Sequence, residues 1–270
     1  MLTSTPQSRK NLTRTLLTLG IAACLAMGSA TAVADEADAK RLLKAMSDYM
    51  AAQEAFSFNY DSMLDVVTTD GQVIGLASSG SLTFNRPDKL KSSRSGGFVD
   101  VESFFDGKTL TLLGKNKNIY LQAEIPGTVD HLIDELKDTY NRPLPAADLL
   151  LSNSYDVLMK DVVDVKDLGS GVIGGVECNS LAFRTTEVDW QIWIAQGDQP
   201  YPCRYVITSK QQTNAPQYSV QVSNWKAGDK VAASDFSFEN TTGAEQVDIE
   251  QLKGMGDLPE IYVIEEGESK

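Results

Sequence analysis

Apolar residues follow two different spacings in the first half of the chain, and each spacing predicts a type of element. Between residues 35 and 53 they recur every three to four positions, which predicts an amphipathic helix with one apolar face. From Phe56 to Ala123 they alternate with polar residues, and turns such as Asp70-Gly71 interrupt the alternation. This second pattern predicts an antiparallel meander of about six strands.

The second half of the chain passes through the same two spacings. Helical spacing covers residues 130–140 and then Pro145 to Met159, where residues 152–154 could divide the second helix. Alternation resumes between residues 162 and 225 and predicts five more strands, with a last short strand at Asp235–Phe238. The glycine-rich stretch Gly169–Gly175 is interpreted as a bulged turn between the first two of these strands.

This order of elements predicts an α+β fold built on one strongly curved antiparallel sheet. A sheet of about 11 strands must curl, so we expect an incomplete barrel whose concave side holds the helices as a lid. No internal repeat and no linker rich in Pro, Gly or Ser divides the chain, which favours one domain over residues 35–253. Residues 254–270 form an acidic tail without periodicity.

Residues 1–34 have the pattern of a cleavable signal peptide. Arg9, Lys10 and Arg14 precede an apolar run, and Ala32-Val33-Ala34 stands before Asp35 as a cleavage site. We therefore expect an exported mature protein that begins at Asp35 and has no membrane span. The alternative is a lipoprotein anchored at Cys24, whose preceding residues resemble a lipidation box.

The charge balance excludes some partners. Removal of residues 1–34 takes away three basic residues and no acidic ones, so the formal charge of −13 becomes −16. Nucleic acids and anionic membranes are bound through Lys and Arg, so neither is an expected partner.

Two cysteines, Cys178 and Cys203, remain after this processing. An oxidising compartment favours a disulfide between them. Consecutive hairpins would place them two strands apart, about 9.6 Å at ~4.8 Å per strand, whereas a disulfide needs Cα atoms within ~7 Å. A bulge or sharper curvature would have to bring them together. Both outcomes stay open at this point.

The segment Asp189–Ile194 carries two tryptophans and two isoleucines, which predicts a strand covered on both faces. Trp190 and Trp193 fall on opposite faces, and we expect the signal helix or the helix at residues 35–53 to cover the face of Trp193. With turns near Thr186-Glu187 and Asp198-Gln199, Phe183 faces Trp190, and Ile192 faces Tyr205. The candidate ligand-binding residues on this face are Leu181, Phe183, Trp190, Ile192, Ile194, Tyr205 and Ile207. The alternative is that the same residues pack against the helices as ordinary core, which is the commoner outcome for such a patch and explains it by stability alone.

Three stretches lie close together in the second half of the chain: Cys178–Arg184 (Cys-Asn-Ser-Leu-Ala-Phe-Arg), Asp189–Ile194 (Asp-Trp-Gln-Ile-Trp-Ile) and Pro202–Thr208 (Pro-Cys-Arg-Tyr-Val-Ile-Thr). Together they resemble the signature of a family of predicted periplasmic proteins, domain-of-unknown-function family 2092. The order of helices and strands also resembles the LolA/LolB-like lipoprotein carriers. The resemblance covers residues 36 to about 240 and implies an incomplete barrel, a periplasmic location and a carrier-like role.

No residue set predicts catalysis or metal binding. The sole histidine, His131, begins a predicted helix without a Ser or Cys partner, and the acidic pair Glu187 and Asp189 is expected by chance in an acidic chain. We therefore expect no enzyme and no cofactor. With the resemblance, the apolar patch favours a binding or carrier protein for a hydrophobic or lipid-like ligand or a lipoprotein acyl chain. The alternative is a non-catalytic structural or interaction module of the envelope with a filled core and no ligand. An envelope protein is a further candidate partner.

Overall fold

The computed structural model describes residues 36–97, 99–228, 231, 235–248 and 262–263. The chain divides into two units, Met1–Ala32 and Val33–Lys270, and every described residue lies in the second. The predicted signal peptide, the alternative anchor Cys24 and most of the acidic tail lie outside the described residues.

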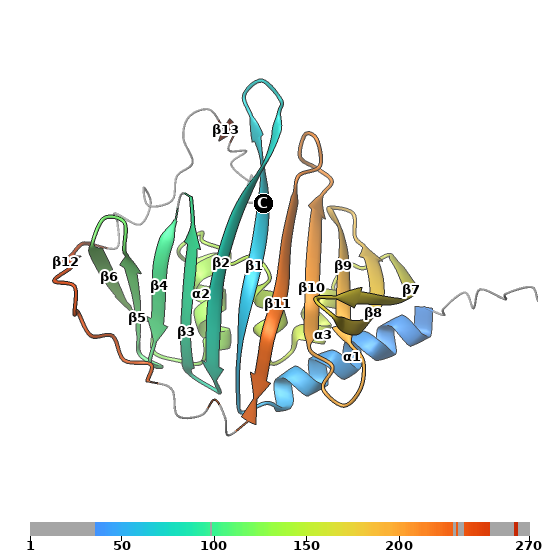
Figure 1. Cartoon of the computed structure of the whole chain (residues 1–270), viewed down its shortest axis with the longest axis horizontal. Helices are drawn as coiled ribbons and strands as arrows, with labels where there is room; N and C mark the ends of the chain where they lie inside the picture. Colours follow the sequence, from blue (N-terminus) through green and yellow to red (C-terminus); the bar gives the residue numbers. More distant parts are fainter. Residues whose placement is uncertain (1–35, 98, 229–230, 232–234, 249–261, 264–270) are drawn as a thin grey trace, which may run out of the picture. The chain divides into compact units, whose positions relative to one another are not determined.

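The second unit is an α+β structure around one open, curved sheet (Figure 1). The first six strands are β1 (Ala55–Thr68), β2 (Val73–Asn85), β3 (Lys89–Gly96), β4 (Asp100–Phe105), β5 (Thr109–Gly114) and β6 (Ile119–Glu124). The next five are β7 (Asp164–Ile173), β8 (Val176–Arg184), β9 (Val188–Ala195), β10 (Pro202–Ser209) and β11 (Gln217–Ala227). Each group is an antiparallel meander, and pairing of β1 with β11 joins the two groups into a single sheet.

The strand order and the curved, open sheet confirm the predicted fold class. Two short strands extend the prediction: β12 (Glu245–Gln246) pairs parallel with β6, and β13 (Tyr262–Val263) pairs with β1. The sheet is therefore mixed, and the acidic tail, whose sequence has no periodicity, contributes two described residues to it.

The predicted strand at Asp235–Phe238 is wrong. This segment has no regular structure, and the Phe238 ring instead packs on the outer face of the sheet, with its centroid 5.6 Å from that of Phe104 and 5.0 Å from that of Tyr120. Phe238 thus covers part of the sheet without joining it. Apolar alternation alone cannot distinguish these two arrangements.

The boundary between β7 and β8 also differs from the prediction. The turn is the pair Gly174-Gly175, both with positive φ (58° and 85°), a conformation that glycine adopts without strain. The preceding glycines belong to β7, which carries an irregularity between Asp167 and Ser170. Val172 is therefore part of β7.

Four helical segments cover one face of the sheet, behind it in Figure 1. They are α1 (Glu36–Ala52), α2 (Val129–Asp138), the 3-10 helix η1 (Ala147–Leu150) and α3 (Ser154–Met159). The predicted division of the second helix is confirmed, because Leu151 to Asn153 separate η1 from α3. The apolar faces of all four pack with every second residue of the strands in one core cluster.

Arg86, at the end of β2, joins the helix layer to the sheet. Its guanidinium donates to the backbone oxygen of Leu150 in η1 at 3.0 Å and to that of Met50 in α1 at 3.4 Å, and it lies 4.8 Å from the ring centroid of Phe84. Both carbonyls come from the last turns of helical segments. The Met50 oxygen also accepts from the backbone N–H of Gln53 at 3.3 Å, so the bond to Leu150 is the stronger link.

Replacing Arg86 with methionine keeps the apolar stem and removes the donors. We expect the free energy of unfolding to fall by about 1–3 kcal/mol, because the half-buried carbonyl of Leu150 loses its partner and that of Met50 keeps only the N–H of Gln53. Urea denaturation measures the change. Arg41→Met on the exposed face of α1 is the matched control and should shift stability by less than about 0.5 kcal/mol. Equal effects of the two substitutions would contradict the proposal that Arg86 connects the helices to the sheet.

Candidate functional site

The seven predicted ligand-binding residues lie together on the helix-facing side of β8, β9 and β10. Phe183 stands opposite Trp190, and Ile192 opposite Tyr205, as the predicted turns require. Six of the seven are at most 3% exposed, and Ile207 is half-buried. They belong to the core cluster that includes the apolar faces of α1, η1 and α3.

Aromatic contacts fill this part of the core. The ring of Trp190 stacks on that of Phe183 with centroids 3.9 Å apart and an interplanar angle of 9°, and the ring of Tyr205 meets Trp190 edge-on at 5.7 Å. Burial raises the pKa of the Tyr205 hydroxyl and that of the Asp148 carboxyl in η1. The region under α1, η1 and α3 is thus closely packed.

The opposite face of β9 is covered differently from the prediction. We expected the helix over residues 35–53, or the signal helix, to cover Trp193. Helix α1 instead packs on the side of Trp190, and the signal segment lies outside the described residues. Trp193 is half-buried, and the guanidinium of Arg204 lies 5.8 Å from its ring centroid.

The middle of the sheet is covered less completely than the part beneath α1. Six large side chains on its helix-facing side are half-buried, and we call them the central floor: Phe58, Tyr60, Leu82, Leu112, Ile207 and Tyr218. They pack against the core cluster and continue it across β1, β2, β5, β10 and β11. The central floor is therefore apolar surface that joins the core without being buried in it.

Element lengths explain why the central floor is only partly covered. The 14 residues of β1 extend over roughly 46 Å at ~3.3 Å per residue, whereas the 10 residues of α2 extend over roughly 15 Å at ~1.5 Å per residue. Short helices cannot cover strands of that length. Sequence analysis placed Phe58 and Tyr60 in a strand, and comparison of these lengths would have identified their face as partly open.

A cluster of hydrogen-bonded polar side chains on β1, β2, β3 and β11 borders the central floor. The Nε of Arg94 donates to the Ser78 hydroxyl at 3.1 Å, which is 2.9 Å from the Ser62 hydroxyl. The Tyr60 hydroxyl donates to the backbone oxygen of Ser93 at 3.0 Å. Burial raises the pKa of Tyr60 to about 12 and also raises that of Tyr218, and the positive charge of Arg94 opposes both shifts.

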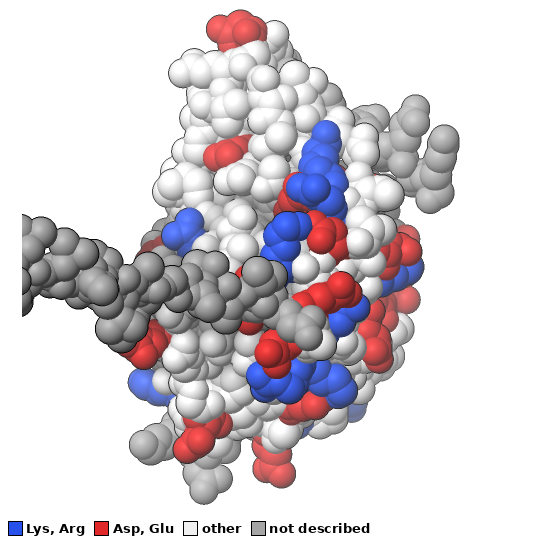
Figure 2. All heavy atoms as spheres, turned by 90° about the vertical axis from the view of Figure 1, so that its right-hand side faces the viewer, with Lys and Arg blue, Asp and Glu red and all other residues white. Residues whose placement is uncertain are grey.

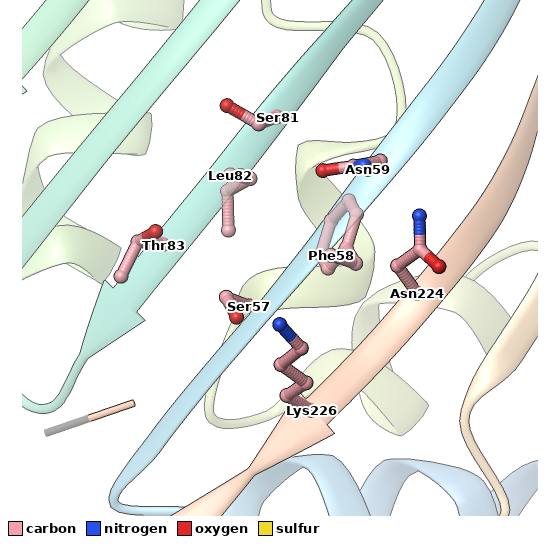
Figure 3. Close-up of a pocket in the computed structure, with 8 residues that line it drawn as sticks. All are labelled: Ser57, Phe58, Asn59, Ser81, Leu82, Thr83, Asn224 and Lys226. Carbon is pink, nitrogen blue, oxygen red and sulfur yellow. The ribbon is translucent and has the colours of Figure 1, made fainter. Parts of the chain in front are cut away.

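A separate hollow of about 210 Å³ lies on the sheet face opposite the helices (Figure 3). A β-bulge opens it: Asn224 in β11 has φ 54°, and the pairing with β1 shifts between Ser57 and Asn59. Its lining is mainly polar, from Ser57, Phe58, Asn59, Ser81, Leu82, Thr83, Asn224 and Lys226. The same bulge turns Trp225 toward the helices, where it stacks on Phe56 with centroids 5.2 Å apart.

Cys178 and Cys203 form a second, small core cluster with Ala195. Cys203 lies at the bulge between Pro202 and Arg204, where the register of β10 against β9 shifts. The two thiols come within hydrogen-bonding contact although β9 separates their strands, and burial raises the pKa of each. Both are free thiols in this structure and less than 2% exposed. The bulge is the feature that the sequence argument needed to bring the two residues together.

We expect these two cysteines to be bonded in protein isolated from an oxidising compartment. Thiol titration under denaturing conditions should then find no free thiol in the processed chain. Reduction should lower the free energy of unfolding by roughly 3 kcal/mol, because the bond closes a loop of moderate length. Two titratable thiols in freshly isolated protein would contradict the bond.

Charges of both signs alternate on the side of the molecule that carries β7, β8 and α1 (Figure 2). Asp189 binds Arg184 at 2.9 Å and Lys210 at 3.1 Å, and Lys44 binds Asp48 at 2.7 Å. These exposed pairs add little stability, but they neutralise the basic side chains involved.

Within the described ranges, no three side chains of His, Cys, Asp or Glu gather closely enough to hold a metal ion. No helix in the same ranges has both the length and the apolar character that crossing a membrane requires. The Thr128 hydroxyl accepts from the backbone N–H of His131 and caps α2.

Residues 39–250 match the model of family DUF2092, described as a predicted periplasmic protein. No curated protein matches the chain. Among solved structures, an uncharacterized conserved protein from Thermus thermophilus is 10% identical, with a TM-score of 0.42 and coverage of 78% of this chain and 99% of that one. The lipoprotein LppX from Mycobacterium tuberculosis is 11% identical (TM-score 0.38; 75% and 100% covered). A LolA superfamily protein from Nitrosomonas europaea is 10% identical (TM-score 0.34; 74% and 99% covered).

Proposed function

Because the chain belongs to the DUF2092 family of predicted periplasmic proteins, we propose that it is a binding or carrier protein for a hydrophobic, lipid-like ligand of the cell envelope. In this proposal residues 1–34 direct export and are cleaved before Asp35. The ligand lies between the sheet and the helix layer, with its apolar part on the central floor.

The central floor is the observation that carries this proposal. Large side chains such as Phe58, Leu82 and Leu112 stay half-buried on the face where the rest of the apolar surface is covered. Burial of one such side chain by a ligand is worth about 1.5–3 kcal/mol relative to full exposure, and half-buried side chains offer part of that. The register places Phe58 directly opposite Leu82, whereas Ser92 and Ser103 separate Leu82 from Leu112. Half-open apolar surface of this kind is a feature of binding sites.

The seven residues predicted from the sequence would extend this site beneath η1 and α3. Ile207 already belongs to the central floor and stands opposite Tyr218, and Tyr205 is the next helix-facing residue of β10. The helical segments above them have four and six residues, and isolated helices of that length are unstable. A ligand longer than the central floor would displace them and reach Trp190 and Phe183.

The second candidate is an envelope interaction module that binds no ligand. The tight packing around Trp190, with six of the seven predicted residues at most 3% exposed, favours it for the region under α1. In that case the central floor would bind a protein partner or stay half-covered.

Native mass spectrometry of protein purified from the periplasm distinguishes the two candidates. A carrier should give an additional mass of one acyl-chain lipid, which organic extraction removes and identifies. A single unliganded mass, together with no uptake of a neutral apolar fluorescent probe, would contradict the carrier. The same spectra give the mature N-terminus, and a lipidated chain that starts at Cys24 would contradict cleavage before Asp35.

A further inference from the structure

Arg94 is the one charged residue at the helix-facing positions of β1 to β6, counted over the described residues of these strands. The register places it beside Gly80 of β2 and Val101 of β4, and Gly80 pairs in turn with Tyr60 of β1. The other helix-facing positions of these strands are apolar side chains, glycines and uncharged hydroxyl-bearing residues. Burying a charge on such a face costs free energy unless a group of opposite charge compensates it.

No carboxylate compensates Arg94 among the residues that the structure describes. The acidic residues of neighbouring β4, Asp100 and Glu102, point to the opposite face, where Lys115 lies 3.8 and 2.8 Å from them. Through its Nε, Arg94 binds the neutral hydroxyl of Ser78. Its two terminal amino groups donate to no protein atom that the description includes. They remain available for an anion.

The surroundings of Arg94 supply further polar groups, and these groups are partly shielded from water. The Ser62 hydroxyl lies 2.9 Å from that of Ser78, and both serines are 8% exposed. Tyr60 and Tyr218 are half-buried beside them. The positive charge of Arg94 lowers the pKa of each tyrosine hydroxyl and so opposes the larger, raising effect of burial. Partial burial strengthens a charge-assisted hydrogen bond, because water competes less for the guanidinium.

The apolar central floor begins directly beside this charge. Arg94 pairs with Gly80, and Leu82 is the next helix-facing residue of β2, roughly 6.6 Å further along at ~3.3 Å per residue. Leu82 stands opposite Phe58 of β1, so the apolar surface continues from there toward the core. One positive charge at the end of an apolar strip matches an amphiphile with an acidic head and an aliphatic tail.

We propose that the ligand is a long-chain fatty acid whose carboxylate binds the terminal amino groups of Arg94 and whose tail lies on Leu82 and Phe58. This inference rests on the proposed function and names its ligand class. A carboxylate carries the single charge that one arginine balances, and its two oxygens match two parallel N–H groups of a guanidinium. A phosphate monoester carries more charge than this face compensates.

Displacement of the neutral probe N-phenyl-1-naphthylamine from the delipidated full-length mature chain tests the proposal. Dodecanoate and dodecanol have the same tail and differ in the head, so their ratio isolates the contribution of the charge. We expect dodecanoate to displace the probe at a concentration at least about tenfold lower than dodecanol. Arg94→Gln should remove that difference and leave dodecanol unchanged, whereas Arg94→Lys should keep part of it.

Lys226→Gln is the matched control, because Lys226 lines the hollow on the opposite face of the sheet. It should leave both displacement curves unchanged. Equal binding of acid and alcohol to the unmodified protein would overturn the fatty-acid assignment and leave the proposed function standing. Failure of the probe and of both competitors to bind would contradict the proposed function itself.

Two further competitors separate the sources of an anion. Dodecyl phosphate that binds more tightly than dodecanoate, with the same dependence on Arg94, would replace the carboxylate by a phosphate headgroup and overturn the assignment. Sodium phosphate or acetate that displaces dodecanoate at millimolar concentration would indicate a site for small anions and would also overturn it. We expect neither effect.

Discussion

Replacing Trp190 with alanine should lower the free energy of unfolding by about 3–5 kcal/mol. The indole is 3% exposed, stacks on Phe183 at 3.9 Å and meets the Tyr205 ring at 5.7 Å. Its removal leaves a cavity that rigid neighbouring strands cannot close, which adds to the lost burial. Urea denaturation followed by circular dichroism measures the change.

Trp193→Ala is the matched control, since it removes the same side chain from the same strand on the other face. Trp193 is half-buried and contacts Arg204, so we expect a loss below about 2 kcal/mol. Equal losses at the two positions would contradict the one-sided cover of β9. A loss below about 1 kcal/mol at Trp190 would mean that the region under η1 and α3 is loosely filled and open to a ligand.

Gly80→Ala should cost about 1–3 kcal/mol and displace Tyr60 from the central floor. A β-carbon at this position would collide with the backbone oxygen of Ser93 and would lie 2.6 Å from the Tyr60 hydroxyl oxygen. Neither the β2–β3 pair nor the tyrosine ring can stay in place, and overpacking of this kind destabilises by that amount. Thermal unfolding measures the cost, and tyrosine fluorescence reports the environment of the ring.

Two variants isolate the cause of this effect. Gly171→Ala in β7 places a β-carbon at ordinary contact distance, 3.5 Å from Trp193, and should change stability by less than about 0.5 kcal/mol. Tyr60→Phe keeps the ring and removes the hydrogen bond to Ser93, with an expected loss of about 0.5–1.5 kcal/mol. A Gly80→Ala chain as stable as Gly171→Ala would show that Tyr60 does not lie across this glycine.

Strand alternation was sufficient to predict the sheet and the shared face of the seven ligand candidates. Side chains at every second position must point to one face, so the pairing of Phe183 with Trp190 followed once the turns were placed. The helices followed equally well, because their apolar spacing is regular and the break after Leu150 coincides with residues that favour turns.

Alternation could not predict how far the helices cover the sheet. Trp190 and Phe58 have the same pattern in the sequence, yet the first is buried under the helices and the second is half-open. How much of the sheet the helices bury depends on the lengths of the helices and on where they pack, and the packing is a tertiary property. Nor could it predict the bulge at Cys203, since one extra residue changes the face that a side chain occupies.

Arg94 was missed for a related reason. In the sequence it stands among serines and lysines and has the appearance of a surface residue, and only the register of β3 against β2 and β4 assigns it to the helix-facing side. The hollow at Lys226 was missed because it depends on the bulge at Asn224, a backbone feature without a sequence signal of its own.

Photo-crosslinking with a diazirine-bearing dodecanol tests the central claim most directly, because it reports where an aliphatic chain lies. We predict adducts on residues of the central floor that do not line the hollow, above all Tyr60, Leu112 and Ile207, in addition to Phe58 and Leu82. These adducts should be lost when excess unlabelled dodecanol is added. Adducts confined to the opposite face, at Ser57, Thr83 or Lys226, or no specific adduct at all, would contradict a ligand site between the sheet and its helices.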